Sequence, residues 1–366
     1  MNPPNAVDES PPPLRSADSQ LPPVEAPTAS FILQLFLIPL LIVSIVVLLW
    51  LLFSWMAHLG RDNPDALLRR LENFDDNSWQ AAKELADVLR SPDPKYDELR
   101  ADRDLAARLA GMLASDMKTP ATGQGKKARA QRRMFLCRAL GMFHVTEGLP
   151  VLLECASQER DLVEAEVRLS AIEAIATLAD RLGPEKIRGE KNVLPTLLAA
   201  SRASDADEPP PPSSDDEPAV YRPHAEVRAV SAYTLGIVGG DEALARLAAM
   251  LGDTYPAARY NAATGLARQG DVRAIRVIKE MLAANNPLAA KDERYPVDQD
   301  RKRAAVLLAG IQASLKLHEE NPTADLSPLG AALDQLASAD LTHIKSDSVK
   351  LQSAAREARQ ILGKRP

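Results

Sequence analysis

Apolar residues in the second half of the chain recur at helical spacing, and one pattern occurs twice, 31 residues apart. The segment 227–236 aligns with the segment 258–267, so that Leu235 pairs with Leu266. The apolar positions that follow each segment are spaced i, i+3, i+6 and i+7, which places them on one face of a helix. Each unit therefore predicts two helices that pack together as a hairpin.

Glycines mark the expected break between the two helices of each unit. Gly239 and Gly240 lie at this point in the first unit, and Gly270 lies there in the second. Glycine lacks a Cβ atom and adopts the left-handed conformation that often ends a helix. Asp241 and Asp271 follow directly, and we expect both to cap the second helices, because aspartate is favoured at a helix N-cap.

A single hairpin of this kind cannot bury its apolar face, so the repeat predicts a stack of hairpins with one continuous core. Further copies of the first-helix pattern begin near Asn77, Arg133, Val167, Arg301 and Val349. Small residues recur at the centre of these patterns, where neighbouring pairs must approach closely and bulk would force them apart. The fold class we expect is all-α: an α-solenoid of about six to seven hairpins over residues 77–363.

The segment 227–236 resembles the repeats of the HEAT family, in particular the short HEAT-like repeats also found in phycobilin lyase subunits. The resemblance covers roughly residues 77–363. It implies a binding scaffold more often than an enzyme. It also implies a ladder between neighbouring repeats, formed by an aspartate near the first helix and an arginine within it. In this sequence Asp253 and Arg259 have the spacing of such a pair.

An apolar run precedes the predicted hairpins. Nineteen of the 23 residues from Phe31 to Phe53 are Leu, Ile, Val or Phe. A helix of this length covers roughly 35 Å, enough to cross the hydrocarbon core of a bilayer. Each of these residues favours insertion by roughly 0.3–0.6 kcal/mol. We predict an uncleaved transmembrane helix over residues 31–56, since a core helix would show a polar stripe and a cleaved signal peptide a short basic leader.

Lys and Arg residues beside this helix determine the expected orientation. Arg15 precedes it, whereas Arg61, Arg69 and Arg70 follow it closely. Positively charged flanks stay on the cytoplasmic side. We therefore expect a single-pass membrane protein with cytoplasmic repeats and the N-terminal tail outside, with the inverted orientation as the alternative.

Two segments have the composition of unfolded chain. Residues 1–30 are rich in Pro and acids and carry a net charge of −3, and residues 203–219 contain six acids and no base. Segments with so few bulky apolar residues cannot offset the entropy of ordering. We predict a disordered tail at 1–30, a linker at 57–76 and a disordered, acidic, Pro-rich insertion at 203–223.

Basic residues form the strongest local charge signal in the predicted repeats. The chain between Met117 and Thr146 contains no acid. Further bases fall on the later second helices, which we expect to line the concave surface of the solenoid. We exclude Arg133, because the repeat itself uses that position. The candidate partner-binding residues are Lys126, Lys127, Arg129, Arg132, Arg246, Arg273, Arg276 and Lys279.

The function we expect is that of a membrane-tethered HEAT-repeat scaffold or adaptor, which binds a protein partner and has no catalysis of its own. One alternative is a HEAT-like enzyme or subunit similar to a bilin lyase. Another is a binder of anionic lipid headgroups or nucleic acid through the basic segment. Aromatic residues make up only 4% of the chain and the repeats are nearly neutral, so we expect no nucleic-acid partner.

Motifs for catalysis or metal binding are absent from the sequence. The five histidines are scattered, and none pairs with a second ligand at a metal-binding spacing. The chain has no phosphate-binding loop, dinucleotide fingerprint or nucleophile elbow. Cys137 and Cys155 fall at apolar helix positions and suggest no disulfide framework. We therefore predict no catalytic residue, no cofactor and no metal.

Overall fold

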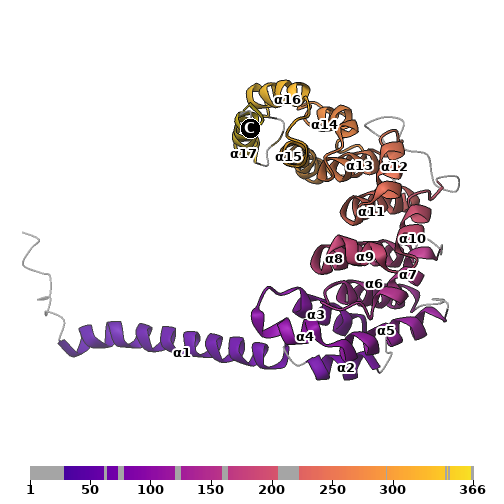
Figure 1. The fold of residues 1–366 in the computed structure, drawn as a ribbon. Coiled ribbons are helices and arrows are strands. Elements are labelled where there is room, and N and C mark those ends of the chain that lie inside the picture. The colour runs from indigo at the N-terminus through magenta and orange to yellow at the C-terminus, as the bar shows by residue number, and fades with distance from the viewer. Residues whose placement is uncertain are drawn as a thin grey trace, which may run out of the picture. The chain divides into compact units, whose positions relative to one another are not determined.

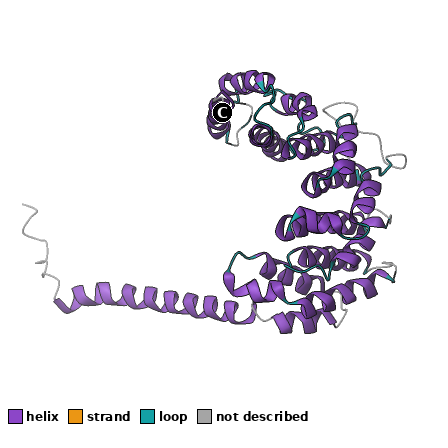
Figure 2. Cartoon of the chain, in the orientation of Figure 1, coloured by secondary structure: helices purple, strands orange, loops and turns teal. Residues whose placement is uncertain are grey.

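The computed structural model describes residues 29–61, 64–72, 78–119, 125–158, 164–204, 222–293, 295–342, 344 and 347–363 (Figure 1). These residues form α-helices and two short 3-10 helices, and no strand occurs among them (Figure 2). The all-α class expected from the sequence is confirmed. Nearly all of the tail predicted at 1–30, and most of the insertion predicted at 203–223, lie outside the described residues.

The chain divides into two compact units, residues 1–62 and residues 63–366. The first unit contains α1 (Ala29–Arg61), a helix that continues through Pro39. Its segment Phe36–Ser54 is long and apolar enough to cross a membrane, with a mean hydropathy of 3.1. The large apolar side chains from Phe36 to Phe53 are all exposed. The helix expected over residues 31–56 is thus present in the structure.

The second unit is a stack of helix pairs. The first helices of the pairs are α3 (Ser78–Arg90), α6 (Lys126–Gly141), α8 (Ala165–Leu182), α11 (Pro223–Val238), α13 (Pro256–Arg268) and α15 (Pro296–Glu320). The second helices are α5 (Arg103–Met117), α7 (Leu149–Ser157), α10 (Val193–Ala200), α12 (Asp241–Met250), α14 (Ile275–Met281) and α16 (Ser327–Ser338). The connections contain η2 (Pro94–Tyr96), α4 (Asp97–Ala101), α9 (Pro184–Gly189) and η3 (Val272–Ala274). The last helix, α17 (Ser348–Gly363), packs on α15 and α16.

The helix α2 (Pro64–Glu72) belongs to the packed unit, although the sequence analysis assigned it to the linker 57–76. Leu67, Leu68 and Leu71 are buried, and α2 packs against α3. The polar residues that suggested a linker lie on the opposite face of the same short helix. A nine-residue helix shows too few turns for its apolar stripe to be read reliably from the sequence.

Buried residues follow one register along four first helices. Counting from an arginine, the residues at +3, +4, +6 and +7 are all buried. The alignment of Leu235 with Leu266 is confirmed, since both lie at +7 and neither has exposed surface. The arginines from which this register is counted are Arg133, Arg168, Arg228 and Arg259.

The register predicted for α15 is wrong. The sequence match placed Arg301 at the arginine position and therefore Leu308 at +7. In the structure the Arg301 side chain is 73% exposed, and the buried pattern is counted from Leu307 instead. This helix is 25 residues long, so it has room for two similar patterns of small apolar residues. The pattern in α17 is also shifted, because Leu351 is buried and Val349 is exposed.

The helix breaks lie at the predicted glycines. Gly239, Gly240 and Gly270 have φ values of +66°, +93° and +72°, in the region that favours glycine. Asp271 caps η3 through a side-chain hydrogen bond from a backbone N–H, as expected. The prediction for Asp241 is wrong, because Gly240 occupies the N-cap and Asp241 is the first residue of α12. Its carboxylate there still faces the positive end of the helix dipole.

The first helices form the more closely packed row of the stack. A Cβ atom at Gly236 of α11 would lie 2.5 Å from the Cα atom of Gly265 in α13. Gly141 of α6 meets Ala174 of α8 in the same way, at 2.8 Å. Neighbouring second helices contact each other less. A stack bends toward its closer row, so the prediction that the second helices line the concave surface is wrong for this part of the stack.

Candidate partner-binding groove

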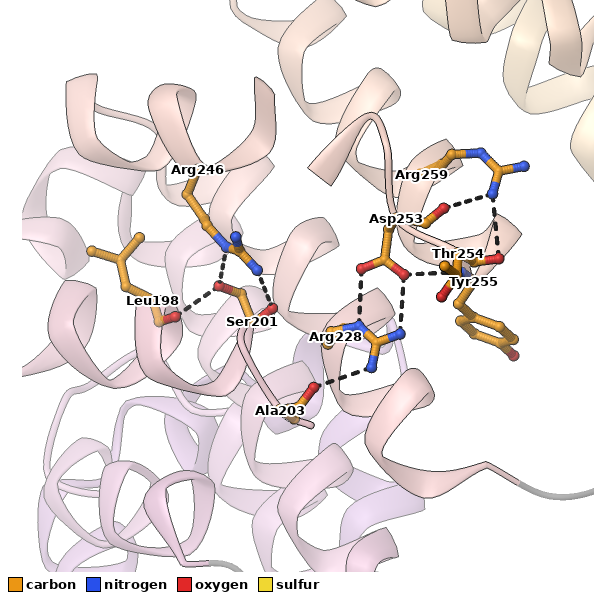
Figure 3. Close-up of polar contacts among 9 residues, drawn as sticks. All are labelled: Leu198, Ser201, Ala203, Arg228, Arg246, Asp253, Thr254, Tyr255 and Arg259. Atoms are coloured by element: carbon orange, nitrogen blue, oxygen red, sulfur yellow. Dashed lines mark hydrogen bonds and ion pairs between the residues drawn. The ribbon is translucent and has the colours of Figure 1, made fainter. Parts of the chain in front are cut away.

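A ladder of arginines joins neighbouring pairs, as the resemblance implied. Arg228 donates to both carboxylate oxygens of Asp253, at 2.9 and 3.0 Å, and to the carbonyl of Ala203 (Figure 3). The expected ladder is thus confirmed at this junction, where Asp253 pairs with the arginine of the preceding pair rather than with the Arg259 side chain of its own unit. Arg259 donates to the backbone carbonyl of Asp253 at 2.7 Å and pairs with the carboxylate of Glu280. These arginines therefore bind a carbonyl before their own helix and an acid that comes later in the chain.

Arg133 has the same two kinds of partner in a buried site. Its side chain has no exposed surface and donates to the carboxylate of Glu164 at 2.6 Å. It also donates to the backbone carbonyls of Asp116 and Thr119. Burying a guanidinium is costly unless its donors find acceptors. Arg133 therefore stabilises the packing of neighbouring helix pairs, which agrees with its exclusion from the candidate binding residues.

Two candidate binding residues connect second helices. Arg246 of α12 donates to the hydroxyl of Ser201 at 2.8 Å and to its carbonyl at 2.6 Å (Figure 3). Ser201 directly follows α10, so this contact caps the C-terminal end of that helix. Arg276 of α14 donates to the carbonyl of Leu251, directly after α12, at 3.1 Å. A cation is favourable at a helix C-terminus, and we call Arg246 and Arg276 the bridging arginines.

The basic cluster predicted around the start of α6 is only partly exposed. Lys126 and Lys127 are the first two residues of the helix, and Lys127 is exposed. Arg129 lies 3.8 Å from the carboxylate of Asp116. Arg132 is 3% exposed, so its guanidinium is not part of the surface. This burial weakens the alternative in which the segment binds anionic headgroups or nucleic acid.

The other two predicted residues lie on the last part of the array. Arg273 pairs with Asp271, and this contact lowers the pKa of the aspartate. Lys279 is exposed on α14. The pair α8 and α10 lies between this region and α6 in the stack. The structure therefore does not bring the eight candidate residues together in one surface.

An open groove lies along the junction of α7 and α10, and sequence reasoning missed it. Its volume is about 760 Å³, within the range of about 300–1,000 Å³ that is usual for ligand sites. Apolar side chains alternate with hydroxyl, amide and charged groups along its walls. The residues that line it are Thr146, Leu149, Pro150, Leu153, Glu154, Ser157, Glu190, Lys191, Asn192, Pro195, Thr196 and Ala199.

Residues 218–293 match the family model of HEAT repeats. The protein contains HEAT repeats. The match covers α11 to α14, where the two most similar units of the sequence lie, and it confirms the resemblance stated for them. No curated protein matches the chain.

The groove in the helical array lies at a junction without a bridging arginine. The residues 191–200 and 241–250 have the same order of buried, partly buried and exposed positions. This correspondence aligns Leu197 with Leu247 and places Thr196 where α12 has Arg246. A threonine side chain is too short to cross to the neighbouring second helix. The groove lined by Thr196 therefore lies at a junction without such an arginine, where α7 and α10 also pack directly against each other.

A buried tyrosine connects three successive HEAT pairs. The Tyr255 hydroxyl contacts the carboxylates of Glu226 and of Asp292, the latter at 2.7 Å. Asp292 also lies 2.5 Å from the ammonium group of Lys302. Burial raises the pKa of Glu226, and the negative charges of Asp292 and Glu166 raise it further. The Tyr255 hydrogen bond and the positive charge of Lys302 lower this pKa, but by less than the total rise. A tyrosine has one proton to donate, so a protonated Glu226 satisfies both contacts.

We expect the free energy of unfolding of the Glu226→Gln variant, relative to that of the wild type, to increase as the pH rises. The folded-state pKa of Glu226 lies above its ordinary value of 4.5. Its contribution to stability is therefore full below that value and is lost as the pH rises through the raised pKa. Thermal unfolding of both proteins at about pH 5 and about pH 8 measures the effect. The exposed Glu242→Gln is the matched control, and an equal pH response of the two variants contradicts the assignment.

Within the described residues no group of three or more His, Cys, Asp and Glu side chains is placed to hold a metal ion. Cys137 and Cys155 are buried free thiols. A hydrogen bond with Cys155, in which the Cys137 thiol is the donor, and burial raise the pKa of this thiol well above its ordinary value. A thiol that is protonated and inaccessible is a poor nucleophile, so this pair supports no covalent chemistry.

Proposed function

We propose that the protein is a membrane-tethered scaffold whose HEAT repeats bind a protein partner, and that it has no catalysis of its own. The observation that carries this proposal is the open groove between α7 and α10 in the helical array. Repeat arrays usually present their concave row to partners, whereas this groove lies between second helices, on the other row of the stack. The partner contacts the walls formed by the two second helices.

The membrane tether in this proposal is α1. Its described apolar side chains are exposed over 18 consecutive residues, Phe36 to Phe53, with Pro39 and Ser44 among them. Burying such a surface in lipid is strongly favourable, at roughly 0.3–0.6 kcal/mol for each Leu, Ile, Val or Phe. The bases Arg61, Arg69 and Arg70, which follow the helix closely, support a cytoplasmic position for the repeats.

The test is site-specific cross-linking in washed membranes. A photoreactive residue at Ala199, an exposed position in the groove wall, is introduced into the full chain. We expect the chain to remain in the membranes after an alkaline carbonate wash, and to form one discrete cross-linked product. The same residue at Val349 on α17, which is 77% exposed, is the control and should give no such product. Release by the wash contradicts the tether, and equal cross-linking from both positions contradicts the groove.

A further inference from the structure

The groove also indicates what kind of partner it binds, an inference that rests on the proposed function. We propose that it binds an extended segment of a partner protein through an arginine side chain, which takes the place of the bridging arginine that α10 lacks. The array itself shows how second helices are joined at two neighbouring junctions. The guanidinium of Arg246 reaches the end of α10, and that of Arg276 reaches the end of α12.

The contacts of Arg246 define the chemistry expected of the missing group. Its Nε and Nη2 atoms donate to two acceptors on one residue, the hydroxyl and the carbonyl of Ser201. The corresponding helix end in the groove is that of α7, where Ser157 is both the last helical residue and part of the lining. The negative end of the α7 dipole lies there and favours a cation.

The charges of the groove wall agree with a cationic ligand. Glu154 and Glu190 line the groove and are exposed, whereas Lys191 is the only base among the lining residues. The lining therefore carries more acid than base, and the C-terminus of α7 adds a partial negative charge at one end of the groove. Charge complementarity of this kind selects the partner and fixes its register more than it sets raw affinity.

The apolar part of the lining suits an arginine rather than a compact cation. Leu149, Leu153 and Pro195 offer apolar surface along which the methylene groups of an arginine stem can lie. The planar guanidinium then presents several donors in a fixed geometry, which an ammonium group does not. The groove, at about 760 Å³, exceeds one side chain, so residues on either side of the arginine occupy the remainder.

The test uses fluorescent nonapeptide pools, degenerate at all positions except the centre, and the full chain in detergent micelles. We expect the pool with a central arginine to bind about tenfold or more tightly than the pool with a central glutamine, with lysine between them. Equal binding of the arginine and glutamine pools overturns the proposal. The readout is fluorescence anisotropy.

Thr196→Arg is the decisive variant, because it supplies the bridging arginine within the chain. We expect it to unfold at the same temperature as the wild type or higher, and to lose the preference for the arginine pool. Thr177→Arg adds the same charge on α8, outside the groove, and should keep that preference. If Thr196→Arg fails to fold, Glu154→Lys replaces it, since this exposed position tolerates change and reversing its charge should weaken arginine binding about tenfold. A variant that folds and binds the pool like the wild type overturns the proposal.

The two proposals fail in different ways. Cross-linking from Ala199 in membranes without any arginine preference leaves the scaffold function intact and removes the arginine-binding groove. Arginine-selective peptide binding without a cross-linked product in membranes supports the arginine-binding groove and contradicts the scaffold function. The groove then has the stated chemistry, but no partner protein occupies it.

Discussion

Replacing Arg133 by alanine should destabilise the protein by about 3–5 kcal/mol, one of the largest effects expected for a single change. The side chain is fully buried, and its guanidinium donates to one carboxylate and to two backbone carbonyls. Glu164 and Asp116 would stay buried and would lose their ion pairs with Arg133. Thermal unfolding of the full chain in detergent measures the loss.

Arg301→Ala is the matched control for this prediction. The sequence pattern aligns Arg301 with Arg133, but the Arg301 side chain is 73% exposed and pairs with Asp298, three residues away. An exposed pair of this kind contributes roughly 0–1 kcal/mol. We therefore expect almost no change in unfolding temperature for Arg301→Ala. Comparable decreases in unfolding temperature for the two variants would show that both arginines occupy the same repeat position, as the sequence alignment predicts.

The helical class and the register of the central pairs were predictable because short-range spacing determines them. The apolar positions between residues 227 and 282 repeat with a period that only helices satisfy, and their glycine breaks need no tertiary information. The partners of the arginines were not predictable in the same way. Arg228 meets Asp253, 25 residues later, and Arg133 meets Glu164, 31 residues later. Only the stacking of neighbouring pairs brings these side chains together.

The candidate binding residues show a related limit of sequence reasoning. Arg246 and Arg276 were selected as bases on second helices, yet the structure uses both to cap the preceding second helix. The groove between α7 and α10 lies where Thr196 occupies the position that Arg246 has in α12. A comparison of corresponding positions along the second helices could have suggested it. That comparison requires the alignment of residues 191–200 with 241–250, which the burial pattern supplies.

Replacing Leu307 by alanine should cost about 2–5 kcal/mol, whereas Leu308→Ala should cost less than about 0.5 kcal/mol. These adjacent leucines distinguish the two registers of α15. The sequence alignment makes Leu308 the counterpart of the buried Leu235, but the structure leaves Leu308 42% exposed and Leu307 only 2% exposed. The observed register is fixed by close packing: a Cβ atom at Gly310 would lie 3.2 Å from the side chains of Met281 and Leu282.

The two alanine variants remove the same atoms from the same helix, so helix propensity and unfolded-state effects cancel between them. What remains is the cavity left in the stack, which only the buried leucine creates. Thermal unfolding of the full chain should therefore show a clear downward shift for Leu307→Ala and nearly none for Leu308→Ala. A larger shift for Leu308→Ala would mean that α15 is rotated by one residue about its axis, and that its first turns pack in the stack as the sequence pattern at Arg301 had indicated.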